Sequence, residues 1–157
     1  MIITDITQID NMAEQMFSHK PNFIVVDIND YNRLKSSSNY LNATSVQMPL
    51  LIKTGIEHFK QAIREFKTER VNKILLQICR VSSALEVQHI NYNEMCMILN
   101  AVEEHFGQKN VAEKQTLHVA STIDEEICKK VDIVWGLSDS KCDDVSDYEI
   151  NVIVGYN

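Results

Sequence analysis

The amino-acid sequence predicts a layered α/β domain, and two observations lead to that prediction. Apolar residues recur at helical spacing in one set of segments and form short, nearly continuous or alternating runs in another. The two kinds of segment alternate along most of the 157 residues, as they do in domains where helices pack on a sheet. A chain of this length buries about two-thirds of its unfolded surface. We therefore expect one domain over residues 1–157.

Helices are expected where apolar side chains recur every three to four residues. The leading segment, residues 1–20, stops before Pro21. A sequence similar to a capping box, Asn91 to Glu94, begins a later helix, and Gly107 is expected to end it. A second such box begins at Thr122. In chain order, the predicted helices span residues 5–18, 28–37, 51–67, 92–106 and 122–130.

Strands are expected where apolar residues form runs or alternate with polar ones. Residues 73–81 read KILLQICRV, a nearly continuous apolar run that is typical of a central strand. In residues 148–154, apolar side chains alternate with Glu149 and Asn151. An acidic loop, Ser138–Asp147, separates the last two strands, and we expect a hairpin-like finish. The predicted strands span residues 39–48, 73–81, 117–120, 131–137 and 148–154.

Charge and hydropathy exclude several partners. The net charge is −7, and the most basic segment, Lys60 to Arg70, also contains Glu65 and Glu69, so we expect no nucleic-acid partner. No apolar run approaches the roughly 20 residues that span a bilayer, so we expect no membrane insertion. The first ten residues contain no basic region followed by an apolar segment. These features predict a cytoplasmic protein.

Cysteine and glycine spacing argue against a metal or nucleotide cofactor. The four cysteines lie far apart and contain no Cys-x-x-Cys pair, which argues against a zinc site and favours reduced thiols. A phosphate-binding loop needs several glycines close together, whereas the four glycines here are isolated. We therefore expect no metal and no cofactor. The cysteines are Cys79, Cys96, Cys128 and Cys142, and the glycines are Gly55, Gly107, Gly136 and Gly155.

Other polar groups favour structural interpretations. No two of the five histidines have the close helical spacing of a ligand pair, and Ser36 to Ser38 indicates a polar helix end. The aspartates of the loop Ser138–Asp147 do not have the spacing of an EF-hand, so a solvated loop is favoured over a calcium site. The histidines are His19, His58, His89, His105 and His118.

The most informative stretch is Pro21–Leu34, which reads PNFIVVDINDYNRL. It sets Asp27 and Asp30 three residues apart, where an apolar run gives way to a helix. Such a pair can cap the helix, because both carboxylates interact favourably with its amino-terminal amides and dipole. The same geometry can also direct acidic groups at a neighbouring molecule. Both interpretations stay open on these residues alone.

The order of elements around this pair resembles the carboxy-terminal half of the FtsZ/tubulin superfamily, nearer to bacterial FtsZ than to tubulin. The family's loop Asn-x-Asp-x-x-Asp corresponds to Val25–Asp30, with Val25 in place of the first Asn. Ile150 to Gly155 resembles the closing strand Arg-Val-Thr-Val-Ile-Ala-Thr-Gly, and Ile133 to Gly136 resembles the strand before it. The resemblance covers residues 8–157, with a probable insertion at 108–130.

This resemblance implies a two-layer α/β sandwich whose mixed sheet has about four strands with helices packed on it. The GTP-binding half of the family is missing, so the chain is not expected to be an enzyme on its own. The loop in FtsZ-like filaments reaches the next subunit's nucleotide, which implies that Asp27 and Asp30 could act in trans in a partner's GTPase site. The implied partners are a tubulin- or FtsZ-like protein, or a second copy of this chain.

Two alternatives from other classes remain. The chain could be an unrelated α/β binding module that homodimerises or binds a small ligand. It could also be a small-substrate enzyme that uses Asp27 or a histidine, although nothing in the sequence supports this specifically.

Overall fold

The structure is a computed structural model of the chain. It describes residues 1–18, 22–24, 26–49, 52–82, 92–116, 131–141 and 147–157. Within these residues, four helices and five strands are present. The helices are α1 (Ile6–Ser18), α2 (Ile28–Ser37), α3 (Ile52–Ile63) and α4 (Tyr92–Thr116). The strands are β1 (Asn22–Ile24), β2 (Tyr40–Pro49), β3 (Val71–Ser82), β4 (Asp132–Lys141) and β5 (Asp147–Tyr156).

The strands form one mixed sheet with the order β1-β4-β3-β5-β2. The β3–β4 pair is parallel, and the other pairs are antiparallel. The predicted hairpin-like finish is wrong, because β3 lies between β4 and β5. The last strand instead inserts between β2 and β3 and pairs with both along most of its length. Its residues from Tyr148 to Tyr156 are buried except for Glu149, which is half-buried, and this suits a central position better than an edge.

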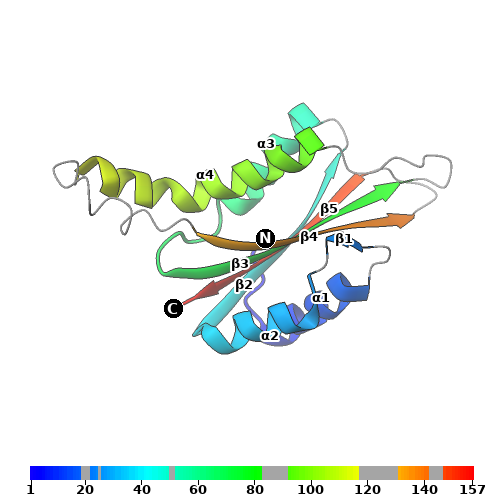
Figure 1. The fold of residues 1–157 in the computed structure, drawn as a ribbon, viewed down its shortest axis with the longest axis horizontal. Coiled ribbons are helices and arrows are strands. Elements are labelled where there is room, and N and C mark those ends of the chain that lie inside the picture. Colours follow the sequence, from blue (N-terminus) through cyan, green and yellow to red (C-terminus); the bar gives the residue numbers. More distant parts are fainter. Residues whose placement is uncertain (19–21, 25, 50–51, 83–91, 117–130, 142–146) are drawn as a thin grey trace.

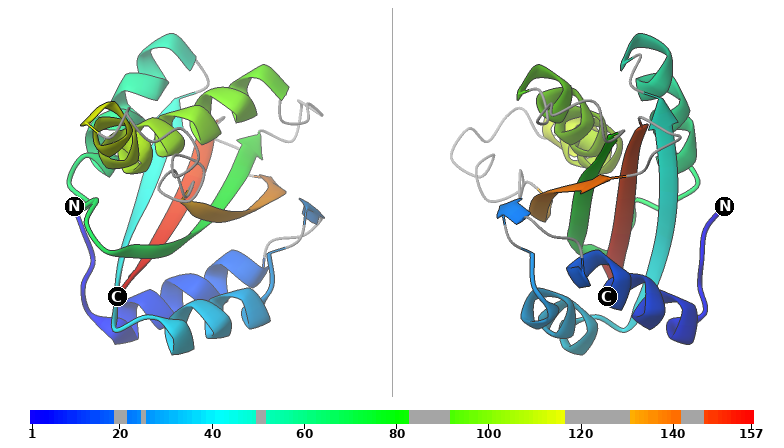
Figure 2. Two further views of the ribbon diagram at one scale, coloured as in Figure 1. Left: turned by 60° about the vertical axis from the view of Figure 1, so that its left-hand side comes forward. Right: turned by 90° about the vertical axis from the view of Figure 1, so that its right-hand side faces the viewer.

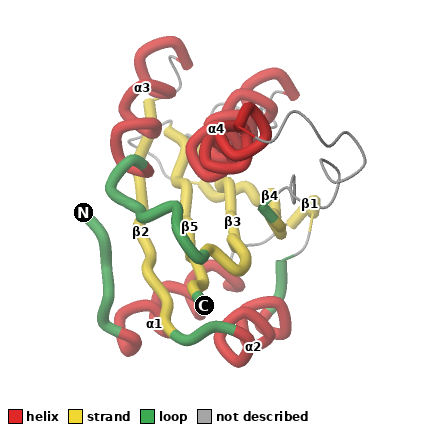
Figure 3. The backbone as a smooth tube through the Cα atoms, turned by 90° about the vertical axis from the view of Figure 1, so that its left-hand side faces the viewer, coloured by secondary structure: helices red, strands yellow, loops and turns green. Residues whose placement is uncertain are grey.

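Helices cover both faces of the sheet, with α3 and α4 on one face and α1 and α2 on the other (Figures 1 and 3). The predicted α/β class and the mixed sheet with helices packed on it are confirmed. The predicted strands at 39–48, 73–81, 131–137 and 148–154 are β2, β3, β4 and β5. The three-residue edge strand β1 was not predicted, because so short a segment gives no periodic signal.

The larger core cluster lies on the face covered by α3 and α4. Every second residue of β5, from Tyr148 to Tyr156, points into it. The helices contribute the apolar stripes predicted from their spacing. Those side chains are Ile56, Phe59, Ile63 and Phe66 from α3 and the turn after it, and Ile98, Ala101, Val102 and Phe106 from α4.

A second cluster lies on the face of the sheet covered by α1 and α2. Both views in Figure 2 show these two helices together on one side of the sheet. The helices bury the side chains that the sequence predicted, including Tyr31 and Leu34 from α2. The sheet contributes four buried residues, which are Leu41, Ala43, Leu75 and Ile153. Both faces of the central strands are therefore covered at this end of the sheet.

Two helix ends differ from the prediction. The helix expected to stop at Gly107 continues to Thr116, because Gly107 keeps a negative φ and does not form a left-handed cap. The residues beyond it are rich in good helix formers. In contrast, α3 ends at Ile63 rather than at residue 67, and a turn closed by the Phe66 amide on the Ile63 carbonyl (3.1 Å) returns Phe66 to the core.

Several other predictions concern the connections. Residues 108–116 of the predicted insertion 108–130 form the last turns of α4. The strand at 117–120 and the helix at 122–130 lie outside the described residues. The loop Ser138–Asp147 is shorter than predicted, because β4 runs to Lys141 and β5 begins at Asp147. In the described part of the chain, no helix is both long and apolar enough to cross a membrane.

Candidate functional site at the start of α2

The first turn of α2 is closed by a reciprocal capping box. The Asp27 carboxylate accepts hydrogen bonds on Oδ1 from the backbone N–H groups of Asn29 (2.9 Å) and Asp30 (3.1 Å). The Asp30 carboxylate accepts a hydrogen bond on Oδ2 from the Asp27 N–H (3.0 Å). The capping role predicted for both aspartates is therefore confirmed. The box satisfies three amides with two carboxylate oxygens, and the second oxygen of each carboxylate takes no part in it.

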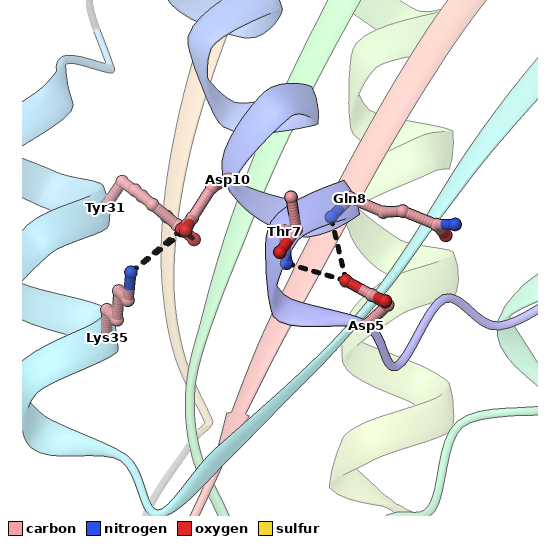
Figure 4. Close-up of polar contacts among 6 residues, drawn as sticks. All are labelled: Asp5, Thr7, Gln8, Asp10, Tyr31 and Lys35. Atoms are coloured by element: carbon pink, nitrogen blue, oxygen red, sulfur yellow. Dashed lines mark hydrogen bonds and ion pairs between the residues drawn. The ribbon is translucent and has the colours of Figure 1, made fainter.

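Polar contacts to α1 hold α2 in place. The Tyr31 hydroxyl donates a hydrogen bond to Asp10 Oδ1, and Lys35 Nζ lies 3.0 Å from the same oxygen (Figure 4). The hydrogen bond from Tyr31, together with the Lys35 ammonium, holds the pKa of the Asp10 carboxyl below its ordinary value. Burial, followed by the bond to Asp10, raises the pKa of the Tyr31 hydroxyl. This cluster was not predicted from the sequence, because Asp10 lies far from Tyr31 and Lys35 in the chain.

The other end of α2 is fixed against the sheet. Asn72 Nδ2 on β3 donates to the Ser37 carbonyl (3.1 Å) and to Ser37 Oγ (3.0 Å). Gly155 on β5 leaves room for the helix to pass. A Cβ placed at Gly155 would lie 2.2 Å from Ser38 Oγ and 2.6 Å from Leu34 Cδ1. The close approach of α2 to β5 therefore depends on the missing side chain of Gly155.

Asp5 forms a similar cap at the start of α1, which was not predicted from the sequence. Asp5 Oδ1 accepts hydrogen bonds from the N–H groups of Thr7 (2.8 Å) and Gln8 (3.2 Å), as Figure 4 shows. The sequence signal was present, because Asp is among the residues preferred immediately before a helix. Asp5 does to α1 what Asp27 does to α2, and it therefore provides a matched control for experiments on Asp27.

The remaining candidates have structural roles or lie outside the described residues. His105 Nε2 lies 3.0 Å from the Phe66 carbonyl, so this histidine joins α4 to the end of α3. His58 is exposed. The hydroxyls of Ser36 and Ser37 donate to carbonyls of their own helix, as a polar helix end would. His19, His89 and His118 lie outside the described residues, as do Cys128 and Cys142.

In the described part of the chain, no three acidic, histidine or cysteine side chains lie close enough together to hold a metal ion. Cys79 is buried and Cys96 is half-buried, and neither forms a disulfide. Glu94, which the sequence analysis placed in a capping box, accepts a hydrogen bond from the Tyr148 hydroxyl of the sheet. Asn91, the other member of that predicted box, lies outside the described residues.

Comparison with protein-family models gives no match for this sequence, and comparison with curated proteins gives none either. The start of α2 combines two carboxylates with a rigid attachment to α1 and to the sheet. This arrangement can present negative charge to a neighbouring molecule.

Proposed function

We propose that this protein acts through protein–protein contacts, as a domain with the organisation of the FtsZ/tubulin carboxy-terminal half. In this proposal its partner is a tubulin- or FtsZ-like filament protein in cell division or a related cytoskeletal process. The start of α2 lies at the contact. Asp27 and Asp30 then face the partner's nucleotide site, where their carboxylates help to orient the attacking water.

The sheet supports this proposal. The resemblance requires the strands that begin near Tyr40, Lys73, Val131 and Tyr148 to lie in one sheet. These are β2, β3, β4 and β5, and they are neighbours in the order β4-β3-β5-β2. Gly155, the glycine of the segment that resembles the family's closing strand, lies where α2 passes closest to β5.

The observation that carries the proposal is the exposure of the helix start. Asp27, Ile28 and Asn29 are exposed, and Ile28 leaves 43% of its surface accessible although it is a large apolar residue. This exposure leaves the carboxylate of Asp27 and the side chain of Ile28 accessible to a partner. The capping box and the contacts to Asp10 keep this surface in one conformation, which lowers the entropic cost of binding.

The proposal also places the protein in the cytoplasm, where thiols stay reduced. The absence of a disulfide at Cys79 and Cys96 agrees with such a compartment.

The test separates the charge of Asp27 from its capping role. Asparagine caps a helix about as well as aspartate, so Asp27→Asn removes the charge and keeps the cap. An FtsZ-type GTPase from the same source is mixed with excess wild-type protein, and GTP turnover and sedimented filament are measured. We expect wild type to change both quantities and Asp27→Asn to lose most of the effect. Asp5→Asn is the matched control and should behave as wild type does.

Two results would overturn the proposal. Turnover and sedimentation unchanged by excess wild-type protein would exclude a role at that filament. If wild type changes both quantities and Asp27→Asn does so equally, the pair caps α2 and has no role in trans. Thermal unfolding of each variant checks that a lost effect does not come from a lost fold.

The alternative function, a module that binds a small ligand, is favoured by a different observation. A polar groove lies beside α1, away from Asp27 and Asp30.

A further inference from the structure

The sheet face beneath α1 changes from apolar to polar along its strands. Asn151 on β5 lies directly opposite Ser45 on β2 and Gln77 on β3. Side chains alternate between faces, so these three point to the side on which the second core cluster lies. They form a polar row across three adjacent strands. The neighbouring residues on that face, Ala43, Ile153 and Leu75, are buried in the core cluster.

Two residues of this row with carboxamide side chains are buried, and one of these carboxamides is not fully hydrogen-bonded. Gln77 and Asn151 each leave only 3% of their surface exposed. Gln77 Nε2 donates to Ser138 Oγ (2.9 Å), whereas Gln77 Oε1 has no partner. The Asn151 carboxamide lies beside it in the row and borders a groove. Buried polar groups are nearly always paired, because leaving them unpaired costs free energy. The row therefore differs from the apolar core beside it.

The row opens into a groove between α1 and the sheet, with a volume of about 320 Å³. This volume lies at the lower end of the range for ligand pockets, which is about 300–1,000 Å³. Figure 4 shows the Gln8 side chain on the opposite side of α1 from Asp10, so the groove is separate from the contacts that hold α2. The groove is lined by Ile3, Gln8, Asn11, Met12, Gln15, Ser45, Glu149 and Asn151.

The lining selects a class of ligand. A carboxamide such as that of Asn151 has both a donor and an acceptor, which suits a planar edge that carries both. Among the described residues that line the groove, Glu149 is the only charged one, so none of them is a lysine or arginine that could hold an anion. A carboxylate accepts hydrogen bonds and repels an acceptor, so it favours a ligand with an amino group. Ile3 and Met12 provide apolar contacts for the faces of a ring.

We propose that this groove binds a nucleobase with an exocyclic amino group, as in adenine or cytosine, without its phosphate. The Asn151 carboxamide pairs with the donor–acceptor edge of the base, as Asn and Gln pair with adenine elsewhere. Glu149 accepts a hydrogen bond from the amino group, as carboxylates do from cytosine. Uracil has a carbonyl oxygen in place of this amino group, and the Glu149 carboxylate repels it. The ligand is a free base or nucleoside rather than a base in a polynucleotide, because a net charge of −7 repels nucleic acid.

The experiment measures dissociation constants for adenosine, cytidine, uridine, adenosine monophosphate and an adenine-containing single-stranded oligonucleotide. We expect adenosine or cytidine to bind about tenfold or more tightly than uridine, the ratio that one good pair of hydrogen bonds gives. The phosphate and the oligonucleotide should each weaken binding. Asn151→Leu, which has a similar shape and no polar atoms, should raise the dissociation constant about tenfold.

A second variant covers the case in which Asn151→Leu does not fold. Glu149→Gln replaces a half-buried side chain, and it should reduce the preference for adenosine or cytidine over uridine. Gln61→Leu on α3, outside this groove, is the matched control and should bind as wild type does. Equal binding of uridine, tighter binding of the monophosphate or the oligonucleotide, or no binding of any nucleoside at millimolar concentration overturns the proposal. Wild-type affinity in both groove variants does so as well.

Discussion

Gly155→Ala adds one methyl group where α2 passes closest to the sheet. Gly155 has no positive φ, so alanine can adopt its backbone conformation, and only the space decides the outcome. The new Cβ would lie 2.2 Å from Ser38 Oγ, 2.6 Å from Leu34 Cδ1 and 3.1 Å from Ser38 Cβ. The Ser38 hydroxyl can rotate away. Leu34 cannot do so easily, because it is fully buried.

The magnitude follows from two opposing effects. Forcing an extra methyl group into a packed core typically costs about 1–3 kcal/mol. Replacing glycine by alanine within a strand stabilises the protein by about 0.5–1 kcal/mol, because alanine loses less conformational freedom than glycine when the chain folds. We therefore expect Gly155→Ala to lower the free energy of unfolding by about 1.5 kcal/mol. For a chain of this size, that corresponds to a decrease of about 3–6 °C in Tm.

Urea and thermal unfolding followed by circular dichroism measure this change. Gly107→Ala is the matched control, because no atom lies within 4 Å of a Cβ at Gly107, in the middle of α4. The same chemical change should there raise the stability by about 0.5–1 kcal/mol. A double-mutant cycle with Leu34→Ala tests the contact itself. The double variant should be more stable than the sum of the single changes predicts, by about 1 kcal/mol.

Three results would contradict this reasoning. A Gly155→Ala protein as stable as wild type would show that α2 does not approach β5 closely. An additive cycle would show that Leu34 is not the obstacle. A destabilised Gly107→Ala protein would show that α4 does not continue as a helix through Gly107.

The other predictions concern the core, the alkaline limb of stability and the cap. Phe59→Ala should destabilise the protein by about 3–5 kcal/mol in urea unfolding, because Phe59 is fully buried; a change below about 1 kcal/mol would contradict the packing of α3. Burial, with Tyr40 nearby, raises the pKa of Tyr156 to about 12, above its ordinary value of 10.0. The protonated Tyr156 hydroxyl contributes to the free energy of unfolding; this contribution is complete below pH 10 and is lost as the pH rises towards 12. Between these pH values the stability of Tyr156→Phe should therefore fall less steeply than that of wild type. An unchanged pH profile would refute this. Asp27→Ala should cost about 1 kcal/mol, whereas Asp27→Asn should cost only a few tenths; equal losses would show that the cap does not matter.

Local patterns predicted most of the elements. The spacing of apolar residues located α1 and α2 within a residue or two, because a helix must bury one stripe of side chains and that stripe repeats every 3.6 residues. The pair Asp27 and Asp30 predicted its own capping box, since the groups that it satisfies lie within three residues. The end of α4 was predicted wrongly from Gly107, because glycine ends a helix only where the backbone turns left-handed.

The pairing of strands was not available from the sequence. Nothing local distinguishes a β5 that follows β4 as a hairpin from a β5 that inserts between β3 and β2. The inserted position is more favourable, because β5 is apolar enough to be buried on both faces and forms hydrogen bonds with a neighbouring strand on each side. The same choice sets Asn151 opposite Gln77 and Ser45, three residues that no sequence motif connects.

The sequence by itself therefore determined the α/β class, the main helices and strands and the cap at Asp27, because each depends on contacts between residues near one another in the chain. Only the tertiary structure decided the strand order, the attachment of α2 through Asp10 and Gly155, and the polar groove beside α1. These features join residues that are distant in sequence, and their free energies depend on burial and on partners that exist only after the chain has folded.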